Sequence, residues 1–334
     1  MKRRSHRLEK MARVYDDEIL PIWSKRFGRM LLRGLTLPEK AMVLDVACGT
    51  GYPAIELLER MGDGGRLIAI EAVGALLDVA RKKAGDLSGK RIFFRTEGNT
   101  AKLAFADEVY DLVVSNLGLL ERDDPKMALR EFARVTKADG KVICTLPLAG
   151  TYREFYDIYR EVLTKSDRHD VLEKLEEHIA RTPDAEEAAT WMEKAGLENV
   201  EVEVDEFHML FKSSREFFFA PVIEYGPLVA WKEVAGKGQA MQETFWLIKE
   251  AIDSYFAGRA FEITVKAGCL RGTRPEVLPE PPPPEPKPET DEVTRPRSGE
   301  VEIETASEKP RKDPSDLRND FKLSDDEEEG AHEQ

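Results

Sequence analysis

The sequence predicts an α/β fold: a doubly wound, mostly parallel, Rossmann-like sheet of seven strands, with N-terminal helices and a helical lid inserted before the last strand. Three observations predict it. Strand-like and helix-like segments alternate through residues 41–146. Several strand candidates are continuous runs of Val, Ile and Leu, which is typical of a parallel sheet covered by helices on both faces. A glycine-rich turn follows the first strand of this region.

The first half of the chain supplies five strands and three helices. Short apolar runs predict strands over Ala41–Ala47, Arg66–Ile70, Ile92–Arg95, Tyr110–Ser115 and Lys141–Leu146. Apolar residues at helical spacing predict helices over Ala54–Met61, Val73–Ala84 and Pro125–Thr136. Gly140 is expected to be the C-cap of the third helix.

The second half predicts a different arrangement. Three helices are expected over Tyr152–Leu163, Val171–Ala180 and Ala185–Ala195. Val200–Val204 alternates apolar and acidic residues, as an antiparallel edge strand does. Phe261–Val265 and the residues up to Leu270 predict the last strand.

An aromatic-rich segment separates these last two strands. Residues 207–258 hold 11 of the chain's 27 aromatic residues and are mostly helical by pattern. Five parts are therefore expected along the chain. They are an N-terminal helical cap (1–40), a Rossmann-like core (41–206), a helical aromatic-rich lid (207–258), the last strand (259–274) and a Pro-rich acidic tail (275–334).

Most of the charge lies in the tail. The formal net charge of the chain is −14; residues 275–334 carry 19 acidic and 8 basic residues, a net charge of −11, which leaves −3 for residues 1–274. The tail has few large apolar residues, so it is predicted to be disordered. The remainder offers no broad basic face, and no nucleic-acid partner is expected. The tail could dock a protein partner, or it could act only as a solubilising segment.

The cysteines and the hydropathy pattern indicate the cellular compartment that the sequence suits. Cys48, Cys144 and Cys269 are far apart and form no Cys/His cluster, so neither a metal site nor a disulfide framework is expected. No apolar run is long enough to span a membrane, and no hydrophobic signal region follows Met1. These features predict a reduced, cytoplasmic protein without stable membrane insertion.

The most informative segment, VLDVACGTGYPA from Val43 to Ala54, is a strand, a glycine turn and the start of a helix. Gly49 and Gly51 allow the backbone to approach a ligand closely and to adopt positive φ. Pro53 suits the first helical turn. Glu71 ends the next strand, where a carboxylate can accept hydrogen bonds from both hydroxyls of a ribose.

The same glycine spacing fits a dinucleotide-binding turn, so an NAD- or FAD-dependent oxidoreductase is the first alternative. Charge distinguishes the two interpretations. A dinucleotide places its anionic pyrophosphate on this turn, where Asp45 would repel it. S-adenosylmethionine (SAM) has no phosphate and carries an ammonium and a sulfonium group. Asp45 therefore favours SAM as the cofactor.

Four sequence segments resemble a known family. VLDVACGTGYPAIELLER resembles the first motif of class I SAM-dependent methyltransferases, especially the ubiquinone/menaquinone-biosynthesis (methyltransferase type 11) group. The resemblance continues through LIAIEAVGALLDVARKKA, EGNTAKLAFADEVYDLVVSNLGLL and MALREFARVTKADGKVIC. It covers about residues 42–146 in the family's order, which is more specific than a single glycine pattern, and it implies a SAM-dependent methyltransferase.

The resemblance also implies a set of cofactor-binding residues. Asp45, Ala47, Gly49 and Gly51 would surround the methionine part of SAM, with Ala47 in place of the family's commoner glycine. Glu71 would bind the ribose, and Ala72 and Val73 would line the adenine. Asn99, with Thr100 beside it, stands where the family usually has Asp and could still accept a hydrogen bond from the adenine amino group. Asn116 would face the methionine end of SAM near the methyl group.

Methyl transfer from a sulfonium is an in-line displacement, for which positioning alone lowers the barrier by about 7–11 kcal/mol. No distinctive catalytic side chain is therefore required. Candidates for a base or orienting group are His208, Tyr225 and Tyr15. His208 could instead be a structural residue. Tyr15 and Trp23 lie in a segment similar to the N-terminal helix that closes over SAM in related enzymes, although simple packing on the sheet would explain the same pattern.

The lid suggests the class of acceptor. Its aromatic residues indicate a small apolar or planar molecule, such as a lipid-like, polyketide or quinone-like compound, although ordinary helix packing also uses aromatic side chains. The residues considered are Phe217, Phe218, Phe219, Tyr225, Trp231, Phe245 and Trp246. The loop after the fourth strand reads SNLG and lacks the Asn/Asp-Pro-Pro-Tyr/Phe pattern of base methylation. A non-catalytic SAM-binding or scaffold protein that uses its acidic tail is the second alternative.

Overall fold

A computed structural model of the chain describes residues 2–120 and 124–278, with side chains from residue 6 onward. Most of the predicted acidic tail, residues 279–334, lies outside the described residues. The description that follows concerns the compact unit that contains residues 1–279.

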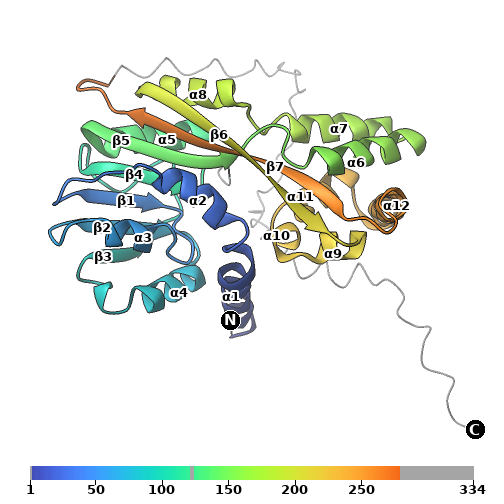
Figure 1. Cartoon of the computed structure of the whole chain (residues 1–334), viewed down its shortest axis with the longest axis horizontal. Coiled ribbons are helices and arrows are strands. Elements are labelled where there is room, and N and C mark those ends of the chain that lie inside the picture. The colour runs from blue at the N-terminus through green and yellow to red at the C-terminus, as the bar shows by residue number, and fades with distance from the viewer. Residues whose placement is uncertain (1, 121–123, 279–334) are drawn as a thin grey trace, which may run out of the picture. The chain divides into compact units, whose positions relative to one another are not determined.

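A single seven-stranded sheet runs through the described chain (Figure 1). Its strands, in sequence order, are β1 (Met42–Val46), β2 (Arg66–Glu71), β3 (Ile92–Thr96), β4 (Tyr110–Asn116), β5 (Thr136–Pro147), β6 (Glu198–Phe211) and β7 (Phe261–Thr273). Their order across the sheet is β3-β2-β1-β4-β5-β7-β6. The first five are parallel, whereas β7 is antiparallel to both β5 and β6. The predicted doubly wound, mostly parallel sheet is thereby confirmed.

Helices precede, connect and follow these strands. They are α1 (Lys2–Val14), the π-helical turn η1 (Tyr15–Ile19), α2 (Ser24–Leu32), α3 (Ala54–Glu59), α4 (Gly74–Ala84), the 3-10 turn η2 (Gly85–Leu87), α5 (Pro125–Val135), α6 (Arg153–Lys165), α7 (His169–Ile179), α8 (Ala185–Lys194), α9 (Ser214–Phe219), α10 (Pro221–Glu224), α11 (Leu228–Ala235) and α12 (Gly238–Tyr255). The two halves of the chain thus differ in character: from β1 to β5, no more than one α-helix of the described chain lies between successive strands, whereas α6–α8 follow β5 and α9–α12 follow β6.

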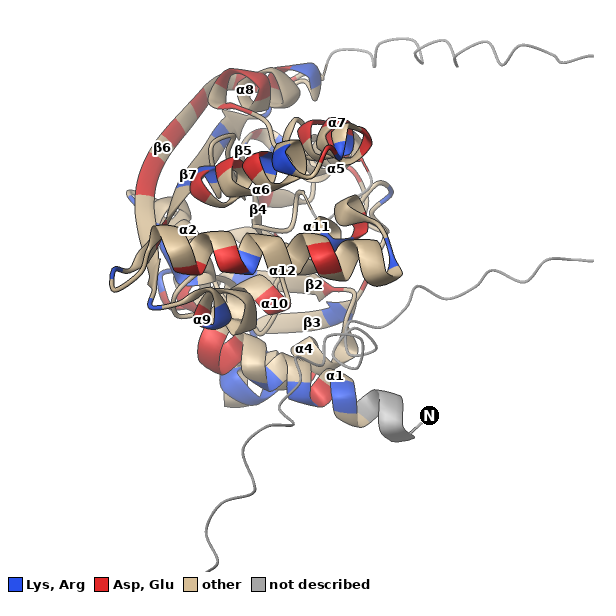
Figure 2. Cartoon of the chain, turned by 90° about the vertical axis from the view of Figure 1, so that its right-hand side faces the viewer, with Lys and Arg blue, Asp and Glu red and all other residues tan. Residues whose placement is uncertain are grey.

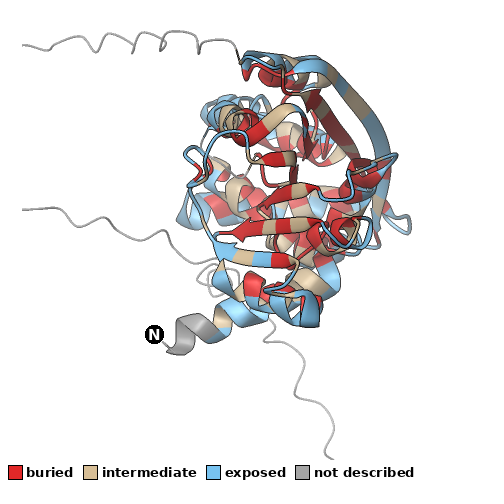
Figure 3. Cartoon of the chain, turned by 90° about the vertical axis from the view of Figure 1, so that its left-hand side faces the viewer, coloured by how far each residue is buried: buried red, intermediate tan, exposed pale blue. Residues whose placement is uncertain are grey.

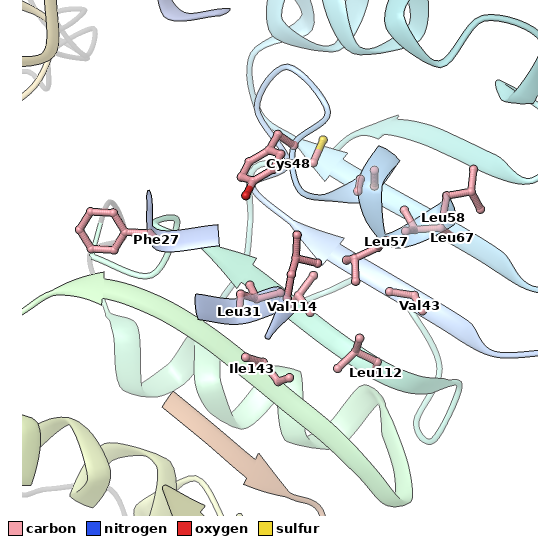
Figure 4. Packing of buried hydrophobic residues seen from close by; sticks show 14 of the residues in the cluster. Phe27, Leu31, Val43, Cys48, Leu57, Leu58, Leu67, Leu112, Val114 and Ile143 are labelled. Atoms are coloured by element: carbon pink, nitrogen blue, oxygen red, sulfur yellow. The ribbon is translucent and has the colours of Figure 1, made fainter. Parts of the chain in front are cut away.

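Two apolar layers cover the sheet. On one face, α2 and α3 pack on the strands, and Figure 4 shows Leu31 of α2 and Leu57 of α3 close to Val114 of β4. On the other face, the core is formed with α5 and α8 and includes Val113. Val113 and Val114 are adjacent in β4 and belong to opposite layers, because successive side chains of a strand point to opposite faces. Buried residues concentrate in the central strands (Figure 3).

The β6–β7 pair extends well beyond the rest of the sheet. The two strands pair from Glu198 with Thr273 to Phe211 with Phe261, whereas β5 reaches only to Ala267 on β7. Around the free ends gather α6, α7 and α9–α12 (Figure 1). We call this group, residues 152–179 and 207–266, the aromatic subdomain. It contains the predicted lid but also includes α6 and α7, which precede that segment in the sequence.

The outer strand β6 is strongly acidic. Figure 2 shows acidic residues along it, and they include Glu201, Glu203 and Asp205. The predicted antiparallel edge strand is confirmed, although it is 14 residues long and not confined to Val200–Val204. Exposed charges on an edge strand discourage pairing with a second sheet.

Three sequence predictions need correction. The third helix ends at Val135 and β5 begins immediately, so Gly140 lies inside β5 and is not a helix C-cap. Asp139 has a φ of 59° beside a shift in the β4–β5 register, and an added Cβ on Gly140 would lie 2.8 Å from the carbonyl oxygen of Lys137. Gly140 thus forms part of a β-bulge.

The helical part of residues 207–258 begins only at α9, because Phe207–Phe211 continues β6. Pro53 is the N-cap residue of α3 and not part of its first turn.

Within residues 2–120 and 124–278, no helix is long and apolar enough to cross a membrane.

Candidate cofactor and acceptor site

The turn between β1 and α3 is built on left-handed backbone conformations. Gly49 and Gly51 have φ of 53° and 96°, which confirms the predicted need for glycine. Ala47 has a φ of 62°, in a region that alanine adopts only at a cost. Its Cβ lies against Gly118, where an added Cβ would come within 2.4 Å of it. The turn therefore depends on a close contact between the ends of β1 and β4.

Two acidic residues lie at this turn. Asp45 is fully buried, and neither of its carboxylate oxygens has a hydrogen-bond partner among the described residues. Glu71, at the end of β2, accepts hydrogen bonds from the backbone N–H of Gly49 (3.2 Å) and of Val73 (3.0 Å). Burial, and then repulsion by Glu71, raises the pKa of Asp45 well above its usual value. The backbone N–H of Ala54 has a smaller effect in the opposite direction and falls short of hydrogen-bond geometry.

This arrangement suits a cationic ligand. An unpaired buried carboxylate is unfavourable, and a cation brought next to it would relieve that cost. Two acids at a turn whose backbone can approach a ligand closely fit the ammonium and sulfonium groups and the ribose of SAM. They do not fit a pyrophosphate on this turn, because the buried Asp45 carboxylate would repel it. The residues present therefore fit the cofactor that the sequence predicted.

The residues expected around the adenine come from two neighbouring segments. An added Cβ on Gly98 would lie 3.3 Å from the Cβ of Ala72, so the loop after β3 runs beside the end of β2. Asn99 is exposed, whereas Thr100 is buried. The backbone N–H of Val73 is held by Glu71, which ties the expected ribose and adenine positions together.

The N-terminal segment closes over the glycine turn. The ring of Tyr15 lies within 3.4 Å of the position of a Cβ on Gly49. Asp16 accepts hydrogen bonds from the Thr50 hydroxyl (2.5 Å) and from the Lys83 ammonium (2.7 Å). Thr50 belongs to the turn and Lys83 to α4, so η1 is attached to both sides of the predicted cofactor site.

Asn116 connects three elements at the end of β4. Its side-chain amide donates to the carbonyl oxygen of Ser24 (3.1 Å), and its side-chain oxygen accepts from the Thr145 hydroxyl (2.7 Å). The Ser24 hydroxyl in turn shares a hydrogen bond of 2.9 Å with the hydroxyl of Tyr15. Two predicted site residues, Asn116 and Tyr15, are therefore joined through the start of α2.

Aromatic side chains continue from this point toward the aromatic subdomain. We call Trp23, Phe27, Tyr152, Phe207 and Trp231 the aromatic wall. Trp23 stacks on Tyr152, with ring centroids 6.1 Å apart and an angle of 9° between the rings. It also makes edge contacts with Phe207 (6.1 Å) and lies 5.1 Å from Phe27. Tyr152 meets Trp231 edge to face at 5.2 Å. Aromatic residues from four regions of the chain thus line up beside the end of β4 and β5.

The candidate bases fall in different places. Tyr225 is the C-cap residue of α10, which packs against η1 and therefore lies near the segment that holds Tyr15. His208 lies within β6, pairs with Thr264 across the strands and has Glu262 (3.2 Å) and Glu206 (3.8 Å) as charged neighbours. It faces the opposite side of the sheet from Phe207, which contacts Trp23. The structure thus brings Tyr15 and Tyr225 toward one region but separates His208 from them.

Most of the aromatic residues of the predicted lid form a core. Phe217, Trp231 and Phe245 are fully buried, and Trp231 stacks on Phe155 of α6 with centroids 4.0 Å apart. The indole N–H of Trp231 donates to the Tyr156 hydroxyl (3.1 Å). Packing, the alternative considered from the sequence, accounts for these residues.

Several contact residues were not identified from the sequence. Asp16, Ser24 and Thr50 carry no pattern of their own, since each acts through a partner distant in the chain or outside any helix or strand signal. A signal exists only for Tyr152, which follows a glycine-containing turn directly after a predicted strand.

Comparison with known proteins gives consistent matches. Residues 4–209 match the model of the ubiE/COQ5 methyltransferase family. Proteins of similar sequence include the demethylmenaquinone methyltransferases of Halalkalibacterium halodurans and Bacillus cereus. Each is 29% identical over 187 residues, which cover 53% of this chain and 76% and 78% of the respective relative. The YcgJ protein of Bacillus subtilis has a similar fold, with a TM-score of 0.50 and 15% identity over 76% of this chain and 100% of its own.

Proposed function

Because the chain belongs to the ubiE/COQ5 methyltransferase family, we propose that it transfers a methyl group to a quinone-type acceptor in its reduced, hydroquinone form. The chain is a SAM-dependent methyltransferase, and its cofactor is S-adenosylmethionine. The family match does not favour the oxidoreductase or the scaffold alternative. The acceptor class is the part that is proposed here.

The aromatic wall is the observation that carries the choice of acceptor. Trp23, Tyr152 and Phe207 form a group of aromatic rings, and Asn116 bonds to Ser24, the neighbour of Trp23. Such a group suits a planar ring system better than a small polar acceptor. The names of the similar proteins, which are demethylmenaquinone methyltransferases, support the same class. A lipid-like chain attached to the ring would extend toward the aromatic subdomain.

We propose the following contacts with the cofactor. Asp45, Ala47, Gly49 and Gly51 hold the methionine part, Glu71 binds the ribose, and Ala72, Val73, Asn99 and Thr100 surround the adenine. Asp45 supports this assignment most strongly, because its buried carboxylate otherwise lacks a partner among the described residues. Asn116 orients the methionine end, and its hydrogen bonds with Ser24 and Thr145 hold its side chain in position.

The chain's contribution to the chemistry is mainly positional. SAM, when bound, would supply an activated methyl group, with the carbon–sulfur electron pair passing to sulfur as the acceptor atom bonds to the methyl carbon. The proton that the acceptor loses passes to solvent. The wall holds the acceptor ring in line, η1 excludes water, and Tyr15 and Tyr225 orient the acceptor's oxygen. His208 is the weakest of the three candidates, given its place on the other side of the sheet.

A cytoplasmic setting is part of the proposal. All three cysteines are buried free thiols, as expected of a protein in a reducing compartment. A protein partner bound through the tail stays a prediction, since the tail lies outside the described residues.

The test is methyl transfer from radiolabelled SAM to 1,4-dihydroxynaphthalene under reducing, anaerobic conditions, with catechol and ethanolamine as acceptors of other classes. We expect turnover of the naphthalene compound at a kcat/KM at least tenfold above the others, about 1.4 kcal/mol of discrimination. Equal or better turnover of ethanolamine would contradict the proposed acceptor class. The Asp45→Asn variant should lose turnover with every acceptor, whereas the exposed Asp63→Asn should keep it.

A further inference from the structure

Tyr152 has an unusual backbone conformation. Its φ and ψ are 62° and 23°, in the left-handed region that a bulky side chain rarely occupies. Such strain persists only where surrounding contacts impose it, and it concentrates at functional sites. Three backbone or side-chain contacts to β7 impose it here: Leu148 N–H to Lys266 O (2.8 Å), Thr151 hydroxyl to Lys266 O (3.2 Å) and Tyr152 N–H to Thr264 O (2.9 Å).

This conformation directs the ring into the interior. The side chain of Tyr152 is only 8% exposed, stacked on Trp23 on one side and in edge contact with Trp231 on the other. Trp23 precedes α2 and Trp231 belongs to α11. The ring of Tyr152 thus stands at the junction between the N-terminal segment and the aromatic subdomain.

The hydroxyl of Tyr152 differs from those of the other tyrosines nearby. Tyr156 and Tyr159 lie in the same helix, α6, and both hydroxyls are hydrogen-bonded: Tyr156 accepts from the Trp231 indole, and Tyr159 donates to the Trp231 carbonyl oxygen, each at 3.1 Å. The described residues offer no such partner to the Tyr152 hydroxyl. Burial raises the pKa of Tyr152, so its hydroxyl stays protonated and can donate a hydrogen bond near neutral pH.

The location is next to the predicted reacting centre. Tyr152 follows β5 after a short turn, and Thr145 of β5 donates to Asn116. Asn116 donates to Ser24, the neighbour of Trp23, and Trp23 stacks on Tyr152. A continuous set of contacts therefore links Tyr152 to the residues proposed to hold the methyl end of SAM.

We propose that Tyr152 is an acceptor-binding residue that donates a hydrogen bond from its hydroxyl to an oxygen on the acceptor ring. The ring of Trp23 stacks on the ring of Tyr152 and holds it in place. The inference rests on the proposed hydroquinone acceptor and adds a requirement to it: an oxygen substituent must reach the Tyr152 hydroxyl. Acceptors of the same shape without that oxygen lose this contact.

The experiment compares Tyr152→Phe with the matched control Tyr159→Phe in the full chain. Equilibrium dialysis in the presence of S-adenosylhomocysteine gives dissociation constants for 1,4-dihydroxynaphthalene and for 1,4-dimethylnaphthalene, which has a similar shape and no oxygen. Tyr152→Phe should weaken binding of the dihydroxy compound about 2- to 10-fold, as for loss of one neutral hydrogen bond, and leave the dimethyl compound unchanged. Its thermal stability should not fall, because the deleted hydroxyl has no partner among residues 2–120 and 124–278.

Tyr159→Phe should show the reverse pattern, with a lower melting temperature and an unchanged ratio of the two dissociation constants. Equal weakening of both ligands by Tyr152→Phe, or no weakening of either, would overturn the assignment, as would failure of the wild-type chain to bind the dihydroxy compound. Turnover is measured separately: binding that depends on Tyr152 without methyl transfer would contradict the proposed function and leave the Tyr152 assignment intact.

Discussion

The glycine-turn region and the aromatic subdomain differ in how far their buried polar groups are hydrogen-bonded. At the turn, Asp45 is buried without a hydrogen-bond partner among the described residues, and Ala47 and Leu117 adopt left-handed conformations. In the aromatic subdomain, the buried polar atoms of Tyr156 and Trp231 are bonded to one another. Buried polar atoms thus lack hydrogen-bond partners at the glycine turn, whereas those of Tyr156 and Trp231 in the aromatic subdomain have them.

This difference distinguishes the region that binds a ligand from the region that stabilises the fold. An unpartnered carboxylate and strained backbone reduce stability until a ligand compensates for them, so they indicate where a ligand binds. A closed aromatic core mainly stabilises the fold. Tyr152 differs from its neighbours in the subdomain. It lies at the junction of the two regions and combines a strained backbone with a hydroxyl that has no partner in the described part of the chain.

The largest expected effect tests the aromatic core. Trp231 is fully buried, whereas Trp246 is 52% exposed on α12. Trp231→Ala should lower the free energy of unfolding by about 3–5 kcal/mol, and Trp246→Ala by less than about 0.5 kcal/mol. Urea unfolding followed by circular dichroism measures both. If Trp231→Ala kept full stability and lost only acceptor binding, Trp231 would belong to the site and the contrast would fail.

The next effect concerns the contact between Ala47 and Gly118. An added Cβ on Gly118 would lie 2.4 Å from the Cβ of Ala47 and 2.9 Å from the hydroxyl oxygen of Ser115. Gly118→Ala should therefore reduce stability by about 1–3 kcal/mol through overpacking. Adding Ala47→Gly should restore part of the loss, because it removes the nearest atom and also the left-handed alanine. Additive effects in the double variant, measured by thermal unfolding, would argue against a direct contact.

A smaller effect concerns the pH dependence of stability without cofactor. The pKa of Asp45 is raised in the folded protein above the value of about 3.9 for an unfolded chain. Between those two values the folded state binds more protons than the unfolded state, so stability falls as the pH rises. Asp45→Asn should remove this fall and make the protein more stable than the wild type at pH values above the folded-state pKa of Asp45. Melting curves from pH 4 to pH 8 should then be flatter for the variant than for the wild type. A variant that is less stable than the wild type at pH 7 would show that Asp45 is satisfied within the protein.

The smallest effect tests the attachment of the N-terminal segment. Asp16 bonds Thr50 and Lys83, while its neighbour Asp17 is exposed. Asp16→Ala should reduce stability by about 1 kcal/mol, largely through the buried Thr50 hydroxyl, because the Lys83 contact is partly exposed and screened. SAM should also dissociate faster from Asp16→Ala than from the control Asp17→Ala in stopped-flow measurements. Identical dissociation rates would show that η1 does not retain the cofactor.

The region around the turn could be predicted well from the sequence because its signals are local. The glycines, the apolar strand runs and Glu71 lie in fixed order within one strand–turn–helix–strand unit, and the observed strands agree within one or two residues for β1 to β4. Two predictions in the first half of the chain were wrong. Pro53 is the N-cap residue of α3, since a helix boundary is uncertain by a residue from sequence alone. Gly140 follows a helix, which indicates a C-cap, whereas a bulge in β5 requires it here.

The aromatic subdomain could be predicted only in part, because its structure depends on distant contacts. The helical pattern and the aromatic enrichment were visible, but the role of α6 was not, since Phe155 meets Trp231 across 76 positions of sequence. The extension of β6 through Phe211 was missed because its partner, Phe261, follows about fifty residues later. The position of Tyr152 depends on hydrogen bonds to β7, which no local pattern indicates.

Calorimetric titration of the full chain with SAM and, separately, with NADH tests the central claim that the turn with Asp45 and Glu71 binds SAM. The account predicts micromolar binding of SAM, no binding of NADH, a loss of SAM affinity of about 10- to 100-fold in Asp45→Asn, equivalent to about 1.4–2.7 kcal/mol, and no loss in Asp63→Asn. Binding of NADH, or undiminished SAM binding by Asp45→Asn, would contradict it.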